Sequence, residues 1–552
     1  MHVDADIAIV GSGFSGSIAA LALRQRGQRV VLVERGRHPR FAIGESSTPL
    51  ANLLIEELAD RYDLPRLRPF SKWGTWQRTR PDVACGLKRG FTFYFHRTGE
   101  AFTDGAGHAR QLLVAASPHD EIADTHWYRP DFDHALVREA QAAGAIYLDE
   151  TRLDGMQQHG DQVILDGSRN GRSVRITAGF VIDASGPRGF LHRALNLPEA
   201  PMQWLPHTHG LYSHFEDVEL WDDSVPNEPA KAGPHVHNGP HVRNSAPPPY
   251  PPDEAALHHV FPGGWIWVLR FNNGITSAGA ALTDPLAAML RASEGAAAWD
   301  RLLEMLPSVQ AQFRHARPVL PFVHAPRLAF RSGEVAGGTW ALLPSAAGVI
   351  DPLLSTGFPL TLLGLSRLLE VLERTSPGPQ RDAALQAYAR VTQEELDVTE
   401  QLVAALYATM DRPAVFKRLS LLYFAAASYS EAARRIGRPA LAPGFLLHGH
   451  PHFGAELRMC AALAPRLRSG QADATDPAAE ARLLARIDRA IEPFDVAGFL
   501  DRSRDDWYPV RADDLIANAS KLEATTEEVH QLLARSGFAS ASHRDTEAQR
   551  IT

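Results

Sequence analysis

The chain begins with an apolar run, a glycine-rich turn and a segment in which apolar residues recur at helical spacing. Ile7–Val10 is uninterrupted and apolar, which is typical of a strand buried on both faces of a parallel sheet. Helical spacing follows over Ser17–Arg26, and Gly27 occupies the position where a helix C-cap is expected. A second apolar run, Val30–Val33, ends at Glu34. The pattern predicts a strand, helix and strand at the start of an α/β fold.

Similar patterns recur along the rest of the chain. Strands are predicted at Leu87–Phe95, Phe180–Ile182, Gly264–Phe271 and Thr339–Leu343, and helices at Asp131–Ala143, after Gly357 and around Val398–Met410. Residues 226–252 are instead dense in proline, glycine, asparagine and histidine, which predicts a loop.

These patterns predict a division of the chain into parts. A Rossmann-type domain is expected over residues 1–200, interrupted by a strand segment at about 65–125, and is expected to return at 331–375. Residues 201–330 are predicted to form an inserted β-sheet domain that shapes the substrate site, and residues 376–552 a helical C-terminal region.

Composition narrows the functional classes. With 552 residues, of which 45% are hydrophobic and 22% charged, the chain is typical of a soluble globular protein with more than one core. A net charge of −8 without long runs of like charge argues against nucleic-acid binding. Neither a signal peptide nor a membrane span is recognisable, and only two cysteines occur, so we expect a reducing, cytoplasmic location. The histidines lie among prolines and glycines and predict no metal site.

Gly11–Gly16 reads Gly-Ser-Gly-Phe-Ser-Gly and matches the dinucleotide-binding pattern G-x-G-x-x-G. The match has the context that this pattern requires, because it follows a predicted strand, opens a predicted helix and is followed by the acidic Glu34. In such turns, Gly11 permits the tight bend, Gly13 the approach of the diphosphate, and Gly16 close packing of helix on strand. The segment therefore predicts a dinucleotide site, with Glu34 accepting hydrogen bonds from the ribose.

Four further segments carry recognisable motifs: Gly44–Pro49 (Gly-Glu-Ser-Ser-Thr-Pro), Phe180–Gly189 with its Asp-Ala-Ser-Gly, Gly264–Val268 (Gly-Trp-Ile-Trp-Val) and Ile350–Gly357 (Ile-Asp-Pro-Leu-Leu-Ser-Thr-Gly). With these segments the chain resembles the flavin-dependent halogenases, within the wider superfamily of flavin monooxygenases and geranylgeranyl reductases. The resemblance spans about residues 5–360, and the helical last third is not diagnostic.

The resemblance implies that the Rossmann-type domain binds FAD. The residues implied to contact FAD are Gly11, Gly13, Phe14, Ser15, Gly16, Glu34, Arg35, Glu45, Ser46, Asp183, Ser345, Asp351, Pro352 and Gly357. Because the chain has a single complete dinucleotide pattern, we expect FADH2 to come from a separate flavin reductase rather than from an NAD(P)H domain.

In this family, reduced FAD and oxygen oxidise a halide to hypohalous acid, which moves to a lysine beside the substrate. The resemblance implies chloride or bromide binding at Ser355, Thr356 and Gly357. Lys88 is the candidate lysine, because aromatic residues follow it on a predicted strand, and Lys72 is a weaker candidate. The substrate pocket is expected to include Trp265, Trp267 and Phe93.

The sequence also departs from the family pattern. Leu269-Arg270 replaces the Ile-Pro that ends the W-x-W-x-I-P motif, and Pro344-Ser345-Ala346-Ala347 replaces a Gly-Asp-Ala-Ala segment. Leu354 stands where tryptophan halogenases carry a glutamate, which favours an electron-rich phenol or pyrrole, free or carrier-bound, as substrate. The departures leave two alternatives open: a flavin hydroxylase or geranylgeranyl-reductase-like enzyme on the same fold, and a flavoprotein without catalytic activity.

Overall fold

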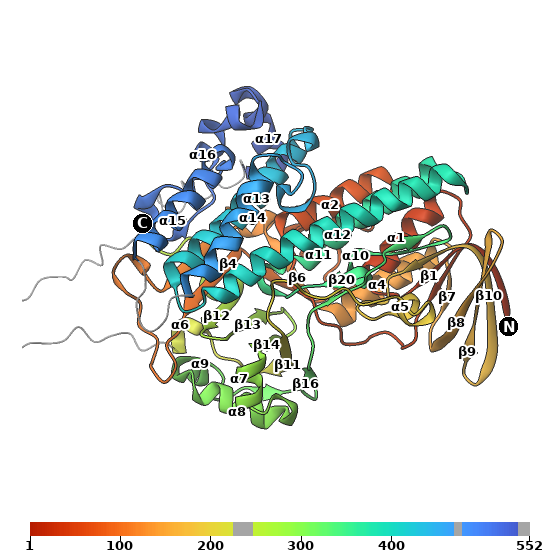
Figure 1. Ribbon diagram of the computed structural model, residues 1–552, viewed down its shortest axis with the longest axis horizontal. Coiled ribbons are helices and arrows are strands. Elements are labelled where there is room, and N and C mark those ends of the chain that lie inside the picture. The colour runs from red at the N-terminus through yellow and green to blue at the C-terminus, as the bar shows by residue number, and fades with distance from the viewer. Residues whose placement is uncertain (225–246, 469–476, 539–552) are drawn as a thin grey trace, which may run out of the picture.

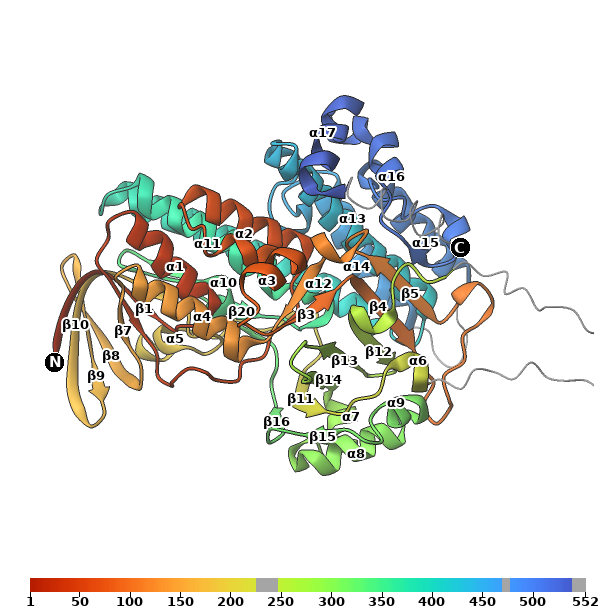
Figure 2. The same cartoon turned by 180° about the vertical axis from the view of Figure 1, so that it is seen from behind.

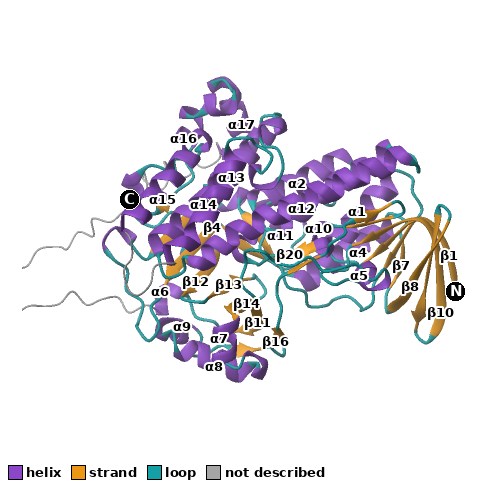
Figure 3. Ribbon diagram, viewed as in Figure 1, coloured by secondary structure: helices purple, strands orange, loops and turns teal. Residues whose placement is uncertain are grey.

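The computed structural model describes residues 1–224, 247–468 and 477–538, so most of the loop predicted at 226–252 lies outside the described residues. Within them, an eight-stranded sheet and a nine-stranded sheet lie next to each other, and helices cover both (Figures 1 and 3). No helix in the described parts of the chain has the length and apolar character needed to cross a membrane.

The first sheet has a parallel centre, as the sequence predicts. Its strand order is β18-β19-β10-β1-β2-β7, and β8 and β9 extend it as antiparallel strands from β10. The bounds are β1 His2–Val10, β2 Val30–Val33, β7 Ile146–Leu148, β8 Thr151–His159, β9 Gln162–Arg169, β10 Arg172–Asp183, β18 Ala336–Gly337 and β19 Trp340–Leu342. Strands β2, β1, β10 and β19 run parallel, so their carboxyl ends share one edge, which is where such sheets bind ligands.

The second sheet combines strands from distant parts of the chain. Its order is β15-β11-β14-β13-β12-β4-β5-β21, with β16 beside β11. The bounds are β4 Gly90–Phe95, β5 Gln111–Ala115, β11 Thr208–Glu216, β12 Ala256–Phe261, β13 Gly264–Arg270, β14 Thr276–Thr283, β15 Arg317–Pro318, β16 Val323–Ala325 and β21 Trp507–Tyr508. The segment predicted at about 65–125 thus contributes β4 and β5, and the helical C-terminal region contributes the edge strand β21.

The strand predicted at Leu87–Phe95 is split in two. Cys85–Lys88 forms β3, which pairs with β6 (Asp124–Trp127) in a small separate sheet, and Gly90 begins β4. The break at Arg89 is fixed by its backbone, whose N–H donates to Glu254 O (2.6 Å) and whose carbonyl accepts from Ala116 N (2.7 Å). Figure 2 shows β3 between the two large sheets, and Lys88 is the last residue of this strand.

Helices complete the layers. The remaining elements are α1 Phe14–Gln25, α2 Pro49–Arg61, α3 Trp73–Thr79, α4 Arg129–Ala142, α5 Phe190–Ala194, α6 Trp221–Ser224, α7 Asp284–Met289, α8 Ala296–Glu304, α9 Pro307–Gln312, α10 Pro344–Ala347, α11 Gly357–Arg374, α12 Pro379–Ala408, α13 Pro413–Arg435, α14 Phe453–Leu463, α15 Pro477–Ile491, α16 Ala512–Ala517, α17 Thr526–Ser536, β17 Phe330–Arg331 and β20 Gly348–Val349. Helices α7–α9 lie below the second sheet and α12–α14 above it (Figure 1). Alternate strand residues therefore enter two different cores, as in other sheets covered on both faces.

Candidate active site

The turn between β1 and α1 has the close packing that its glycines predict. At Gly11, with φ of +101°, an added Cβ would lie 2.5 Å from Ala184 O, and at Gly16 one would lie 2.0 Å from Gly11 O. The N-cap residue of α1, Gly13, offers no side chain to the first backbone N–H groups, and the first turn contains no acidic residue. These N–H groups and the positive end of the helix dipole suit a diphosphate.

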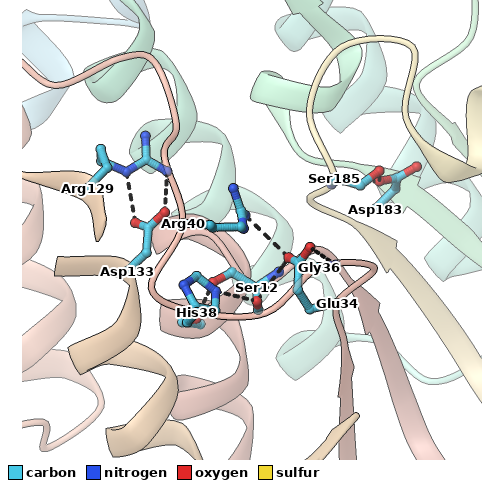
Figure 4. A network of polar contacts seen from close by, with 10 residues as sticks. Ser12, Glu34, Gly36, His38, Arg40, Arg129, Asp133, Asp183 and Ser185 are labelled. Atoms are coloured by element: carbon cyan, nitrogen blue, oxygen red, sulfur yellow. Dashed lines mark hydrogen bonds and ion pairs between the residues drawn. The ribbon is translucent and has the colours of Figure 1, made fainter. Parts of the chain in front are cut away.

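Glu34 organises the edge beside this turn (Figure 4). Its carboxylate accepts hydrogen bonds from Ser12 N (3.1 Å), Ser12 Oγ (3.0 Å) and Gly36 N (2.9 Å), and pairs with Arg40 at 3.2 Å. Burial raises the pKa of Glu34, but Arg40 and the backbone donors outweigh it, so the pKa is lowered and the group is a carboxylate. Arg35, which was predicted to contact FAD, is solvent-exposed. The positive charge beside Glu34 comes from Arg40.

A buried arginine that the sequence did not single out joins the motif segments. Arg129, in α4, forms a bidentate pair with Asp133 (2.8 and 2.7 Å) and donates to Gly44 O (2.9 Å). Its guanidinium lies 5.2 Å from the ring centroid of Phe14, and that ring contacts Phe358 at 5.0 Å. The Gly11–Gly16 turn, the Gly44–Pro49 segment and the start of α11 therefore converge at one place. Arg129 lies two residues before the helix predicted at Asp131–Ala143, so the prediction did not place Arg129 and Asp133 on one helix face.

Asp183 ends β10 and is fully buried. It accepts from Ser185 N (2.8 Å), Ser185 Oγ (2.6 Å) and Leu191 N (2.6 Å), so its hydrogen bonds stabilise its own turn. Ser345 is half-buried in α10, which follows β19 at the same edge of the sheet. Both residues lie near the predicted cofactor edge, and neither has a described contact with the Glu34 network.

The Gly44–Pro49 segment contains a buried pair of ionisable groups. Glu45 Oε1 lies 2.9 Å from Nε2 of His214 on β11, and both side chains are almost fully buried. The other carboxylate oxygen, Oε2, has no partner among the described residues. Glu45, predicted to contact FAD, thereby connects the Rossmann-type part of the chain to the second sheet.

Lys88 is fully buried at the centre of the molecule. Its ammonium donates to Ser46 Oγ (2.8 Å) and to Ser47 O, and lies 3.7 Å from the ring centroid of Phe91. Burial lowers the pKa of Lys88 to about 7, although Asp124 opposes the shift. The lysine thus lies between a motif segment on one side and an aromatic residue of the second sheet on the other.

Asp124 lies opposite Lys88 across the β3–β6 pair and is also buried. Its Oδ1 accepts from Asn52 Nδ2 at 2.7 Å, whereas its Oδ2 and Asn52 Oδ1 have no partner among the described residues. Burial raises the pKa of Asp124 to about 7 against the effect of Lys88. His126, two residues along β6, is fully buried and has no described partner for either ring nitrogen, and burial keeps its pKa well below the usual value. Asp124, Asn52 and His126 were not singled out from the sequence.

A deep pocket opens on this cluster. It encloses about 1340 Å³ of empty space, part of it open to solvent, between β4, β5, α2, α13 and the last helices. Its lining includes both Asn52 and Asp124 together with aromatic residues: Phe91, Tyr423, Phe424, Phe499 and Tyr508. Lys72 lies in the same lining and pairs with Glu56 at 3.7 Å. The mainly apolar lining with a few polar groups is typical of a small-molecule site.

The Ile350–Gly357 segment has unusual backbone geometry. Leu354 and Ser355 both adopt left-handed φ angles, 64° and 55°, and Gly357 is exposed at the start of α11 with open space around it. Such strained residues persist only where their surroundings hold them. Here Tyr423, which also lines the pocket, donates to Leu354 O at 2.9 Å.

Asp351 fixes the same segment from the other end. It accepts from Leu353 N (2.9 Å) and from the hydroxyl of Tyr407 (2.8 Å), which in turn receives a hydrogen bond from Trp265 Nε1 (3.2 Å). Burial raises the pKa of Asp351 to about 7, although these hydrogen bonds lower it. The first tryptophan of the Gly264–Val268 segment therefore connects β13 to the loop predicted to bind halide.

The residues predicted to line the substrate pocket are buried on strands of the second sheet. Trp265 and Trp267 are buried on one face of β13, with ring centroids 5.6 Å apart. Phe93 is fully buried and stacks on His258 at 4.4 Å. None of these residues is in the lining of the large pocket, to which β4 contributes Phe91 instead. Phe91 and Phe93 are two positions apart on β4, so both side chains leave the sheet on its helical side. The alternation of the strand therefore did not indicate which of the two lines this pocket.

Comparison with known proteins identifies the family. A family model for FAD-dependent oxidoreductases matches residues 6–320. Monodechloroaminopyrrolnitrin halogenase of Pseudomonas fluorescens is 31% identical over 412 residues, which cover 73% of this chain and 67% of that protein. The chain belongs to the flavin-dependent halogenases. Tetracycline 7-halogenase of Kitasatospora aureofaciens is another relative, 30% identical over 72% of this chain and 69% of its own length.

Solved halogenase structures share the fold. The halogenase PltM in complex with phloroglucinol and FAD has a TM-score of 0.75 with this chain and is 23% identical, covering 88% of this chain and 96% of its own. The likeness extends into the C-terminal helical region, whose sequence was predicted to be helical but was not diagnostic of the family. As a member of these families, the protein is an FAD-dependent oxidoreductase.

Proposed function

We propose that this flavin-dependent halogenase uses FADH2, oxygen and chloride or bromide to halogenate an electron-rich aromatic ring, with Lys88 as the catalytic residue beside the substrate. The observation that carries the proposal is the position of Lys88. Its ammonium bonds Ser46 and Ser47 on one side and contacts Phe91, a residue of the pocket lining, on the other.

The residues at the carboxyl edge of the first sheet fit FAD. The uncapped N–H groups of α1 would hold the diphosphate, and Glu34, kept ionised by Arg40, would accept from the ribose hydroxyls. Gly13, Phe14, Ser15, Glu45, Ser46, Asp183, Ser345, Pro352 and Gly357 would complete the site, and Arg129 joins them as a residue that fixes Gly44 over the turn. Bound as FADH2, the cofactor supplies the reduction of oxygen and the oxidation of halide to hypohalous acid.

The halide is assigned to the start of α11. Ser355, Thr356 and Gly357 form a corner at the start of the helix, strained at Leu354 and Ser355, and the space at Gly357 is open. Backbone N–H groups at such a corner suit a small anion. Tyr423, which donates to Leu354 O and lines the pocket, joins this corner to the substrate side.

Lys88 would receive hypohalous acid and present its halogen to the ring. As an ammonium it donates hydrogen bonds to the oxidant and protonates the departing hydroxide. A pKa lowered to about 7 by burial makes that proton transfer easier than from a solvent-exposed lysine.

The substrate is proposed to be a phenol or a pyrrole-type ring, free or attached to a carrier. Because position 354 is a leucine, it provides no carboxylate to assist removal of a proton from the substrate. The aromatic ring of the substrate must therefore be made reactive by its own substituents. The relatives agree with this substrate class by their names, among them a 1H-pyrrole-2-carbonyl carrier-protein chlorinase of Pseudomonas fluorescens. FADH2 is proposed to come from a separate flavin reductase, since the chain has a single complete dinucleotide pattern.

The test is incubation of the protein with FAD, a flavin reductase, NADH, bromide and a panel of phenols and pyrroles, followed by mass spectrometry. Brominated products that require both bromide and reductase are the expected result. Hydroxylated or reduced products, formed equally well without halide, would favour the hydroxylase or reductase alternatives. Omission of the reductase is the control for FADH2 from another source.

A further inference from the structure

Two buried acceptor atoms beside the pocket lack donors. Asp124 is 4% exposed and Asn52 is 3% exposed, yet Asp124 Oδ2 and Asn52 Oδ1 have no partner among the described residues. The two side chains are bonded to each other through Asn52 Nδ2 and Asp124 Oδ1 (2.7 Å), which fixes the amide with its oxygen free. Buried acceptors without donors are uncommon in folded proteins, so such a pair indicates a ligand that donates.

Both residues line the large pocket, whose other walls are mainly apolar and aromatic. An aromatic ring with one N–H or O–H group would pack against the apolar walls and donate a hydrogen bond to the unpaired acceptors of Asp124 and Asn52. Asp124 also lies directly opposite Lys88 in the β3–β6 register. A ring held at Asp124 is therefore held close to the lysine.

We propose, on the basis of the function proposed above, that Asp124 and Asn52 form the binding site for the ring hydroxyl or ring N–H of the substrate, and that Asp124 is the base that takes this proton during halogenation. Burial raises the pKa of Asp124 to about 7, so its carboxylate is a stronger base than an exposed aspartate. Asp124 thus provides a carboxylate that can accept a proton, which the side chain of Leu354 cannot do.

The proton balance closes with these two residues. For a phenol, Asp124 takes the hydroxyl proton, and the ring carbon attacks the halogen of hypohalous acid. The carbon–halogen bond forms as the oxygen–halogen bond breaks, and the departing hydroxide becomes water with a proton from the Lys88 ammonium. The ring carbon then gives its proton to the Lys88 amine, and Asp124 returns its proton to the substrate oxygen. Phenol and hypohalous acid thus give halophenol and water, with both residues regenerated.

The first measurement needs no turnover. We would titrate 4-nitrophenol into the FAD-loaded, oxidised protein at neutral pH, where Asp124 is partly ionised, and record the absorbance difference from the same amount of free probe. Wild-type protein is expected to bind the probe with the phenolate band, and Asp124→Asn without it. Asn52→Ala keeps the carboxylate, so it is expected to bind the probe more weakly but with the band. Asp120→Asn removes an exposed aspartate on the same segment, and is the matched control.

The second measurement compares halogenation of resorcinol with that of its dimethyl ether, which has no proton to give. Asp124→Asn is expected to reduce kcat/KM for resorcinol about 100-fold, a typical effect of removing a general base, while the ether reacts equally with both proteins. Asn52→Ala is expected to raise KM more than it lowers kcat. Flavin absorbance and circular dichroism establish that each variant is folded.

A phenolate band that persists in Asp124→Asn, together with an unchanged preference for resorcinol, would overturn the proposal. Should the Asp124 variant fail to fold, a wild-type protein that binds the probe only as neutral phenol would overturn it as well. A wild-type protein that makes no halogenated product contradicts the proposed function instead, and the absorbance titration still decides the role of Asp124.

Discussion

The ammonium nitrogen of Lys88 lies 2.8 Å from the hydroxyl oxygen of Ser46, so the strand that carries the lysine is held directly against the Gly44–Pro49 segment. This contact connects two parts of the chain whose roles were inferred separately, one for the cofactor and one for the substrate. It is possible because β3 ends at Lys88 and the chain changes sheets at Arg89.

Flavin binding should distinguish Arg40 from Arg35. Arg40→Ala removes the cation that keeps Glu34 ionised, so we expect the dissociation constant for FAD to rise about tenfold, the effect of losing one charge-assisted hydrogen bond. Arg35→Ala should leave it unchanged, because Arg35 is exposed and has no described contact with Glu34. Fluorescence titration of the two variants with FAD measures both constants. Equal losses in the two variants would show that the Glu34 network does not hold the cofactor.

Tyr407 should control the corner through Asp351. Tyr407→Phe removes the hydroxyl between Asp351 and Trp265 and leaves a buried carboxyl oxygen without its donor, which costs about 1–3 kcal/mol of stability. Because the corner then loosens, we expect the KM for bromide to rise severalfold with little change in the KM for the aromatic substrate. Ser277→Ala, which removes a 3.3 Å hydrogen bond from the indole of Trp267 and leaves both tryptophan rings in place, is the control. Steady-state kinetics with varied bromide would contradict this account if the two variants behave alike.

Activity should depend on pH through the Lys88–Asp124 pair. Asp124, with a pKa of about 7, must be ionised and Lys88, with a pKa of about 7, must be protonated, so kcat/KM should fall on both sides of neutral pH. The other titratable groups around the pair include His126, His258, Tyr423, Glu431 and Arg435. Burial holds the pKa values of both histidines far below neutral and raises that of Tyr423, so these three stay uncharged.

The pH profile of Asp124→Asn checks this assignment. Loss of the acidic limb with the alkaline limb retained is the expected result. An unchanged acidic limb would assign that limb to a different group.

Asp351 should make the folded protein less stable as pH rises. Its carboxyl has a pKa of about 7 in the folded state and an ordinary value near 3.8 when unfolded, because folding buries it. The folded state therefore holds a proton that the unfolded state has lost between about pH 4 and pH 7, and stability falls across that window by up to about 4 kcal/mol. Urea unfolding of Asp351→Asn at pH 5 and pH 8 should show a smaller decrease than the wild type, and an equal decrease would contradict the assignment.

The sequence predicted the first sheet and the glycine turn well, because both depend on local patterns. Ile7–Val10, the Gly11–Gly16 turn and Val30–Val33 form the elements expected of them. Lys88 was also singled out from the sequence, through the aromatic residues that follow it, and its catalytic role stays a prediction. The resemblance that supplied its role is confirmed at the level of the family.

The rest of the site depends on contacts between distant segments, which local patterns do not reveal. Asn52 and Asp124 are 72 positions apart and meet only because α2 packs beside β6. Tyr407 reaches the site from a helix whose spacing indicated only a buried face. Arg129 precedes the helix predicted at Asp131–Ala143, and Tyr423 lies in a region that was predicted only to be helical. Arg35 was among the residues implied to contact FAD, whereas Arg40, which was not singled out, is the arginine that the chain brings back to the Glu34 carboxylate.

The central claim is that Lys88 transfers halogen from the cofactor side to the substrate, and one comparison tests it most directly. Wild type, Lys88→Met and Lys72→Met would each be supplied with FADH2, oxygen and bromide, with measurement of brominated phenol and of free hypobromous acid caught by a scavenging thiol. We predict that Lys88→Met still releases hypobromous acid but loses brominated product at least 100-fold, whereas Lys72→Met keeps most of its product. Undiminished bromination by Lys88→Met would contradict the account.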